Sequence, residues 1–172
     1  MFFFILLPFF VLAVLTWLLP VSLSLALSAA VAAGVVIHDR ARGGGFKLLN
    51  VATLVLFAGL ALALAASGGE PRAPLVRIVV NGGLLAVTLA SLGLRSPFTL
   101  QYARDQVGAD IAARPQFLRA MYVLSWTWAG TFALMLGVDV VALLCPQLPV
   151  WSGLAVTFAA RNAAVQFTKW YA

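Results

Sequence analysis

Residues 47–66 read KLLNVATLVLFAGLALALAA, and this stretch decides the class of the fold. Its only charge is Lys47 at the first position, and leucine, valine and alanine make up most of the rest. A helix needs roughly 20 mostly apolar residues to cross the hydrocarbon core of a bilayer. The stretch has that length, so it predicts a membrane-spanning helix.

Runs of this kind recur along the whole chain. Of its 172 residues, 63% are hydrophobic and 9% are charged, and the mean hydropathy is +1.05. These values lie far outside the range of a soluble domain. We predict an all-α polytopic membrane protein, a single transmembrane domain over residues 1–172, with six transmembrane helices at about residues 2–19, 21–37, 47–66, 75–94, 119–144 and 150–168.

The connections between the predicted helices alternate in charge. The first, third and fifth are short and carry almost no net charge, whereas the second (38–47) and the fourth (95–119) are basic. Lys and Arg close to the ends of membrane-spanning helices are retained in the cytoplasm. We therefore predict three helical hairpins with tight outer turns, and both the N-terminus and the C-terminus in the cytoplasm.

The fourth connection is long enough to have structure of its own. Its apolar residues recur at spacings of three and four, at Leu100, Ala103, Val107 and Ile111. The charged residues fall elsewhere on the helical wheel, so residues 98–113 predict an amphipathic helix on the cytoplasmic membrane surface. Such a helix either covers the end of the bundle or senses a partner or lipid.

Several classes of function find no support in the sequence. The net charge of +6 is not arranged as a basic stripe interleaved with aromatics, which argues against nucleic-acid binding. The single Cys145 excludes an internal disulfide and a cysteine metal cage, and the single His38 lies in a predicted loop. No catalytic triad, paired carboxylates or dinucleotide fingerprint is present, so we predict no catalytic residue, cofactor or metal.

Asp139 is the strongest candidate for a functional residue. It lies about 9 Å inside the predicted fifth span, too deep for its short side chain to reach the interface. It must therefore face water, accept a partner or carry a proton. Arg77 enters the fourth span from the same outer side, and Asn81 lies one turn deeper on the same face. The alternatives are an outer pocket for an ion, proton or headgroup, a structural ion pair that orients two helices, and an Arg77 side chain that extends to the outer surface by itself.

A second polar patch lies on the sixth span, at Arg161, Asn162 and Gln166. The stem of Arg161 can extend toward the cytoplasmic interface. Asn162 and Gln166 are one turn apart and share a helix face, where they can hydrogen-bond to a neighbouring span. This patch is either an inner part of an ion pathway or a structural contact between helices.

The layout also resembles a known family. Six short spans, tight outer turns and the return sequence RSPFTLQYAR at residues 95–104, with its Arg95-Ser96-Pro97 step, are similar to the bacterial intracellular septation protein A family of small inner-membrane proteins. After the second span, Arg40-Ala41-Arg42-Gly43 takes the place of this Arg-x-Pro step. The resemblance implies a role in the bacterial inner membrane and no known reaction, so it carries over no catalytic residue.

Three hypotheses follow for the function. The first is a small transporter or channel for an ion, proton or small solute, with Asp139 on its pathway. The second is a non-catalytic scaffold of the cell envelope that binds a second copy or a partner membrane protein. The third is an enzyme acting on a lipid headgroup. The lack of a nucleophile–base pair near either interface argues against it. Membrane lipids are partners under all three.

Overall fold

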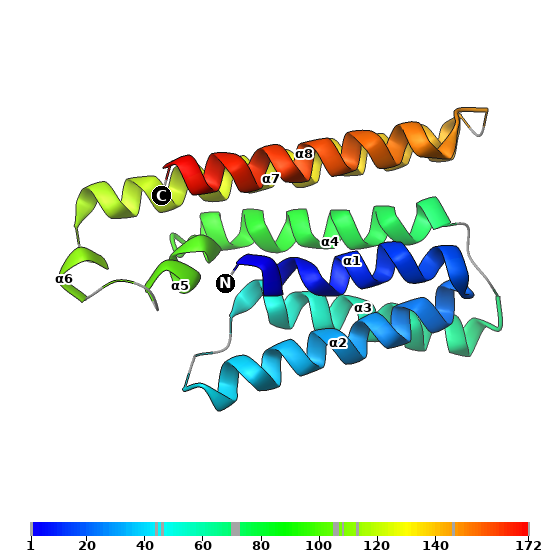
Figure 1. Cartoon of the computed structure of the whole chain (residues 1–172), viewed down its shortest axis with the longest axis horizontal. Coiled ribbons are helices and arrows are strands. Elements are labelled where there is room, and N and C mark those ends of the chain that lie inside the picture. The colour runs from blue at the N-terminus through cyan, green and yellow to red at the C-terminus, as the bar shows by residue number, and fades with distance from the viewer. Residues whose placement is uncertain are drawn as a thin grey trace. The chain divides into compact units, whose positions relative to one another are not determined.

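The computed structural model describes residues 2–43, 45, 47–69, 73–104, 107, 109–112, 114–145 and 147–171. Every regular element within these residues is an α-helix (Figure 1), so the all-α prediction is confirmed. The helices are, in order, α1 (Phe2–Leu18), α2 (Val21–Ala41), α3 (Leu48–Ser67), α4 (Ala73–Gly93), α5 (Phe98–Arg104), α6 (Ala109–Ala112), α7 (Pro115–Leu144) and α8 (Val150–Tyr171).

Four of these helices, α2, α3, α4 and α7, are long and apolar enough to cross a membrane. Four helices of this length and apolarity are typical of a protein that spans a bilayer and not of a soluble protein of this size. The chain is therefore a membrane protein. Helix α1, with 17 residues, is shorter than these four helices. Helix α8 has 22 residues but is less apolar, because it carries two charged residues and two amides.

The helices extend beyond the predicted spans at their basic ends. The sequence predicts His38 and Asp39 in a loop, and this prediction is wrong. Helix α2 continues to Ala41, so both residues lie in its last turn. Helix α7 begins at Pro115, before the predicted start at residue 119. Apolar character ends where the bilayer ends, but backbone hydrogen bonding continues into water. Proline also favours the first position of a helix, because its missing N–H is not needed there.

The amphipathic helix predicted over residues 98–113 is replaced by two short helices, α5 and α6, with Val107 in a bend between them. Part of the predicted stretch, including Asp105, lies outside the described residues. The intervening sequence contains Gly108, and glycine has a low helix propensity. Most of α5 is buried, at Phe98, Thr99, Leu100 and Tyr102, so it packs inward instead of lying on a surface.

The connection from α4 to α5 contains a strained residue. Arg95 has a φ of +56°, the only positive φ of a non-glycine residue in the described chain. Its N–H donates to the Leu92 carbonyl at 3.1 Å, and the Ser96 N–H donates to the Ser91 carbonyl at 3.0 Å. These two bonds form the Schellman motif that ends many helices, with arginine where glycine is usual. Ser91, Leu92 and Arg95 therefore fix a sharp end to α4.

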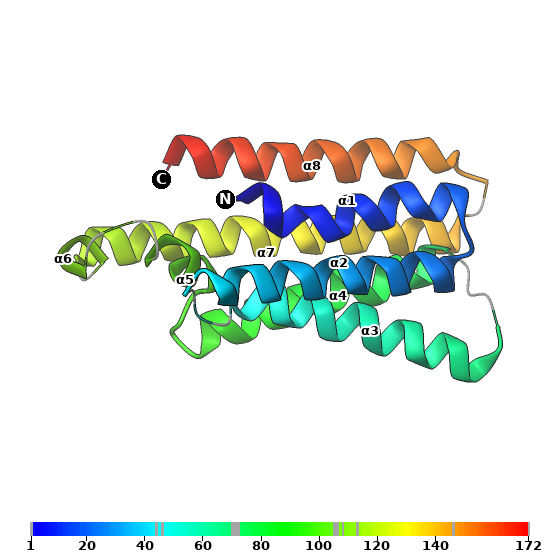
Figure 2. The same ribbon diagram turned by 60° about the horizontal axis from the view of Figure 1, so that its bottom comes forward.

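The chain divides into two compact units, Met1–Val76 and Arg77–Ala172, here called unit 1 and unit 2. In unit 1, α1 and α2 form a hairpin, and α2 also packs against α3 (Figure 2). The buried face of α2 is made of small residues and a few larger apolar ones: Ser24, Leu25, Ser28, Ala29, Ala32 and Val35. Small side chains allow helices to approach closely. Phe9 and Phe57 join α1 to α3 edge to face, with ring centroids 5.4 Å apart.

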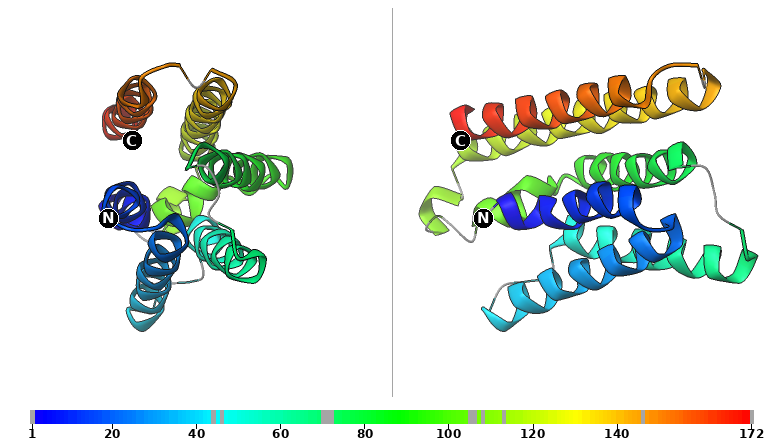
Figure 3. Two further views of the ribbon diagram at one scale, coloured as in Figure 1. Left: turned by 90° about the vertical axis from the view of Figure 1, so that its right-hand side faces the viewer. Right: turned by 45° about the vertical axis from the view of Figure 1, so that its right-hand side comes forward.

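Unit 2 is built on a second hairpin, α7 and α8, which run side by side along their length (Figure 3). Helix α5 packs against α7, and Leu100, Met121 and Leu124 form a buried cluster there. The Trp128 indole N–H of α7 donates to the Thr168 hydroxyl of α8 at 3.2 Å. These contacts hold α8 to a helix that is itself long and apolar enough to span a bilayer.

Candidate functional site

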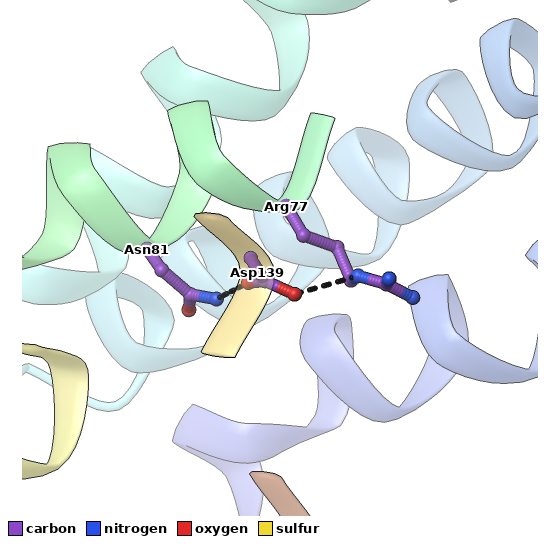
Figure 4. A network of polar contacts seen from close by, with 3 residues as sticks. All are labelled: Arg77, Asn81 and Asp139. Carbon is purple, nitrogen blue, oxygen red and sulfur yellow. Dashed lines mark hydrogen bonds and ion pairs between the residues drawn. The ribbon is translucent and has the colours of Figure 1, made fainter. Parts of the chain in front are cut away.

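The site is built around the carboxylate of Asp139 on α7, which accepts two hydrogen bonds from α4 (Figure 4). The Nε of Arg77 donates to Oδ1 at 2.9 Å, and the Nδ2 of Asn81 donates to Oδ2 at 2.7 Å. Each carboxylate oxygen therefore has one donor. The structure brings together the three residues that the sequence placed at the outer end of two neighbouring helices.

Local helix geometry places the two donors. Arg77 and Asn81 are four residues apart, so both side chains project from the same face of α4. Arg77 lies four residues into α4, or about 6 Å along the axis, and Asp139 lies five residues before the end of α7, about 7.5 Å along it. Gly82 of α4 lies near Leu136 of α7, at a spacing where a Cβ on Gly82 would make ordinary van der Waals contact with a Leu136 methyl group at 3.8 Å.

Burial differs strongly across the cluster. The Asp139 side chain is 3% exposed, and the Arg77 side chain is 31% exposed. A buried charge requires a partner of opposite charge and hydrogen bonds to its remaining polar atoms. Asp139 has both, and the cluster as a whole is electrically neutral. Its cationic end is the accessible one.

Two chemical roles are open to this arrangement. It can act as a clamp that holds α4 against α7, because three polar groups satisfy one another in an apolar setting. It can also act as a site that responds to a proton or an ion, because Asp139 is ionisable and lies within the spanning part of a membrane helix. The second role requires Asp139 to exchange its partners, whereas the first does not.

The second predicted patch does not assemble in the same way. Arg161 is partly buried, whereas Asn162 and Gln166 are exposed. The Asn162 amide donates to the Phe158 carbonyl of its own helix at 2.9 Å, so this bond is made within α8 and not to another helix. The patch is also at a different level from Asp139. Gly153 of α8 packs against Val138, the residue before Asp139 on α7. Arg161 lies eight residues after Gly153, which is about 12 Å farther along the axis of α8.

Unit 1 contains a polar cluster that the sequence did not predict. The Asp39 carboxylate Oδ2 accepts a hydrogen bond from the Asn50 amide at 2.8 Å and lies 3.5 Å from the Lys47 ammonium nitrogen. The Lys47 side chain is only 4% exposed. The sequence predicts Asp39 in a loop, beside His38. The available signal was Asn50, an amide in the first turn of an otherwise apolar helix.

Buried hydroxyl groups gather near the other end of α4. The Ser91 hydroxyl donates to the Thr88 carbonyl at 2.7 Å, and the Thr99 hydroxyl oxygen lies 2.8 Å from both the Met121 carbonyl and the Ser125 hydroxyl. The Thr88 hydroxyl is fully buried and is the one buried side-chain polar atom without a hydrogen-bond partner among the described residues. Isolated Ser and Thr residues in apolar spans gave no sequence signal for this grouping.

Metal binding finds no support in the described part of the chain, where no three His, Cys, Asp or Glu residues lie together. Comparisons with protein-family models, with curated proteins and with solved structures find no match for this chain. The resemblance to the intracellular septation protein A family therefore stays a prediction from layout and motif.

Proposed function

We propose that this protein is a six-span bacterial inner-membrane transporter for an ion, proton or small solute, with Asp139 as its ion-responsive group. The observation that carries the proposal is the buried Asp139 carboxylate, paired with Arg77 inside two helices that are apolar enough to span a bilayer. Ionisable side chains at such depth are rare and mark ion pathways and proton relays more often than surface charges do.

The packing within each unit supports six spans instead of four. Helix α1 packs against α2, and α8 packs against α7, so each lies beside a candidate membrane-spanning helix. Helix α8 is 22 residues long, or about 33 Å, enough to cross the hydrocarbon core. Because α8 follows α7 along its length, it lies at the same depth as a helix that spans the bilayer.

Charge placement supports cytoplasmic termini. In unit 2, the last-residue ends of α4 and α8 lie on the same side as the start of α7 (Figure 1). Arg95 follows α4 by two residues, Lys169 is in the last turn of α8, and Arg119 is in the first turns of α7. In unit 1, Arg40 and Arg42 lie at the end where α1 begins (Figure 1). The positive-inside rule then assigns both of these ends to the cytoplasm.

The test is a flux assay on purified protein in liposomes. A trapped pH dye and trapped cation and anion indicators report movement of protons and ions after a gradient is imposed. We expect a net flux down the imposed gradient in the wild type and its loss in Asp139→Asn. A folded wild type without flux of protons, cations or anions would refute the transporter function.

The matched control variant is Asp139→Asn combined with Asn81→Asp, which moves the carboxylate from α7 to α4. The carboxylate introduced at position 81 would remain one turn from Arg77 and could still accept a hydrogen bond from the amide introduced at position 139. If the cluster is only a clamp, this variant regains both folding and flux. If the carboxylate must titrate at its place on α7, the variant regains folding but not flux.

A second function, a scaffold that pairs with another copy, is favoured by the exposed face of α8. Ala155, Ala159 and Ala163 are exposed at four-residue spacing, flanked by the exposed amides of Asn162 and Gln166. In lipid an amide has no water to bind, and a carboxamide is both donor and acceptor, so two identical faces can satisfy each other.

Cysteine cross-linking tests this scaffold function. In a Cys145→Ala background, Gln166→Cys should form a disulfide dimer in native membranes. The control is Leu134→Cys, a position on α7 that is also exposed. Equal cross-linking at both positions, or none at Gln166→Cys, would argue against pairing through α8.

A further inference from the structure

The Arg77–Asn81–Asp139 cluster also indicates which class of substrate it serves. We propose that Arg77 binds a small inorganic anion and that Asp139 takes up one proton with it, so that the two cross together without net charge. This inference rests on the proposed transport function and adds the substrate class and the coupling.

The hydrogen bonds argue against a cation at this site. Both Asp139 oxygens already accept a donor, from Arg77 and from Asn81. A metal cation needs several oxygen ligands, and it would have to approach beside a guanidinium whose Nε lies 2.9 Å from Oδ1. Displacing the guanidinium would leave Arg77 without a counter-charge in an apolar setting.

The same geometry leaves donors for an anion. Arg77 uses Nε for Asp139, and Figure 4 shows its two terminal nitrogens on the far side of Nε from Asp139. No hydrogen bond or ion pair of these Nη groups is found among the described residues. A guanidinium presents its N–H groups in a planar fork that suits oxyanions and halides. The Arg77 side chain is also the exposed part of the cluster, at 31% against 3% for Asp139.

Charge balance then couples the anion to a proton. With Asp139 ionised and Arg77 charged, the cluster is neutral, and an added anion would leave it with one net negative charge. A proton on Asp139 restores neutrality and releases Nε from its ionic partner, and Asn81 can still hydrogen-bond to the neutral carboxyl group. One anion with one proton is therefore the change that keeps the site neutral in both states.

The other charged groups near Asp139 do not alter this balance. Arg77 is the charged group that reaches Asp139 from α4. Helix α8, packed along α7, carries Arg161 and Lys169, and Arg161 lies eight residues beyond the Gly153–Val138 contact, about 12 Å along the axis. Among the described residues of unit 2, Asp139 therefore has one close counter-ion.

The experiment measures acidification inside liposomes that contain the full-length protein and a trapped pH dye. An inward proton gradient is imposed with chloride, nitrate or inorganic phosphate outside, and with gluconate as the large-anion control. Protein-free liposomes give the background. We expect acidification with at least one small anion, at least a tenfold lower rate in gluconate, and no acceleration by valinomycin with potassium, because the coupled movement carries no current.

Variants separate the two roles. Arg77→Gln should lose acidification, and Arg77→Lys, which keeps the charge but not the fork, should lower its rate at least tenfold. Asp139→Asn should lose acidification but retain exchange of labelled chloride for nitrate at equal pH, because Arg77 remains. Equal exchange by wild type and Arg77→Gln would overturn anion binding at Arg77.

The outcomes distinguish this inference from the transport function on which it rests. Acidification that is equal in gluconate, or that requires valinomycin, would preserve transport but overturn anion coupling. A lipid phosphate permanently bound to Arg77 would give the same independence from the external anion, and would also overturn it. No movement of any ion would refute the transport function itself.

Discussion

Replacing Arg77 by methionine tests whether the Asp139 pair holds unit 2 together. The substitution keeps most of the apolar stem and removes the guanidinium, so Asp139 keeps only the Asn81 hydrogen bond while its side chain, 3% exposed, stays buried. Removing one partner of a buried ion pair costs about 3–5 kcal/mol. Because Arg77 is itself 31% exposed, we expect a cost at or below the lower end of that range, about 2–3 kcal/mol.

The magnitude has an internal control in the double variant Arg77→Met with Asp139→Asn. The amide introduced at position 139 can accept from or donate to Asn81 after a flip of either amide, and no charge remains buried. Replacing both members of a buried pair is often close to neutral. We therefore expect the double variant to recover most of the lost stability, with a coupling energy of about 2 kcal/mol.

The assay is reversible unfolding in mixed micelles, followed by tryptophan fluorescence, to which Trp128 contributes as a residue buried in unit 2. The free energy of unfolding is compared for wild type, both single variants and the double variant. Arg77→Met within about 0.5 kcal/mol of wild type would refute a buried, charged Asp139 that depends on Arg77. Additive single effects would refute the pairing even if each variant were unstable.

Three further predictions concern other parts of the chain. Arg95→Gly should raise the melting temperature, because glycine relieves a left-handed residue at a gain of about 1 kcal/mol, and an unchanged or lower value would contradict the strain. Thr99→Val, which removes the hydroxyl that contacts Met121 and Ser125, should lower the free energy of unfolding by about 1–2 kcal/mol, and a change below about 0.3 kcal/mol would contradict that role. Asp39→Ala should destabilise unit 1 by about 1–3 kcal/mol, measured by unfolding in micelles, since it removes a carboxylate that Asn50 and Lys47 contact.

The sequence by itself determined the class of the protein and most helix positions. Long apolar runs are removed from water by a bilayer, and a helix satisfies its own backbone hydrogen bonds in lipid, so the long helices could be predicted from local composition. The pairing of Arg77 and Asn81 on one face also followed from the helical repeat. The helix ends were less predictable, as at Ala41 and Pro115, because hydropathy reports the membrane boundary and not the last hydrogen-bonded turn.

Only the tertiary structure decided which polar groups meet. Asp39 and Asn50 are on different helices, and their contact depends on how α2 and α3 pack, which no local spacing encodes. The inward packing of α5 is similar, since Thr99 finds its partners 22 and 26 residues away on α7. In an apolar medium such contacts depend on how the helices of the whole unit pack together. The position of each helix, in contrast, depends on the local composition of its own apolar run.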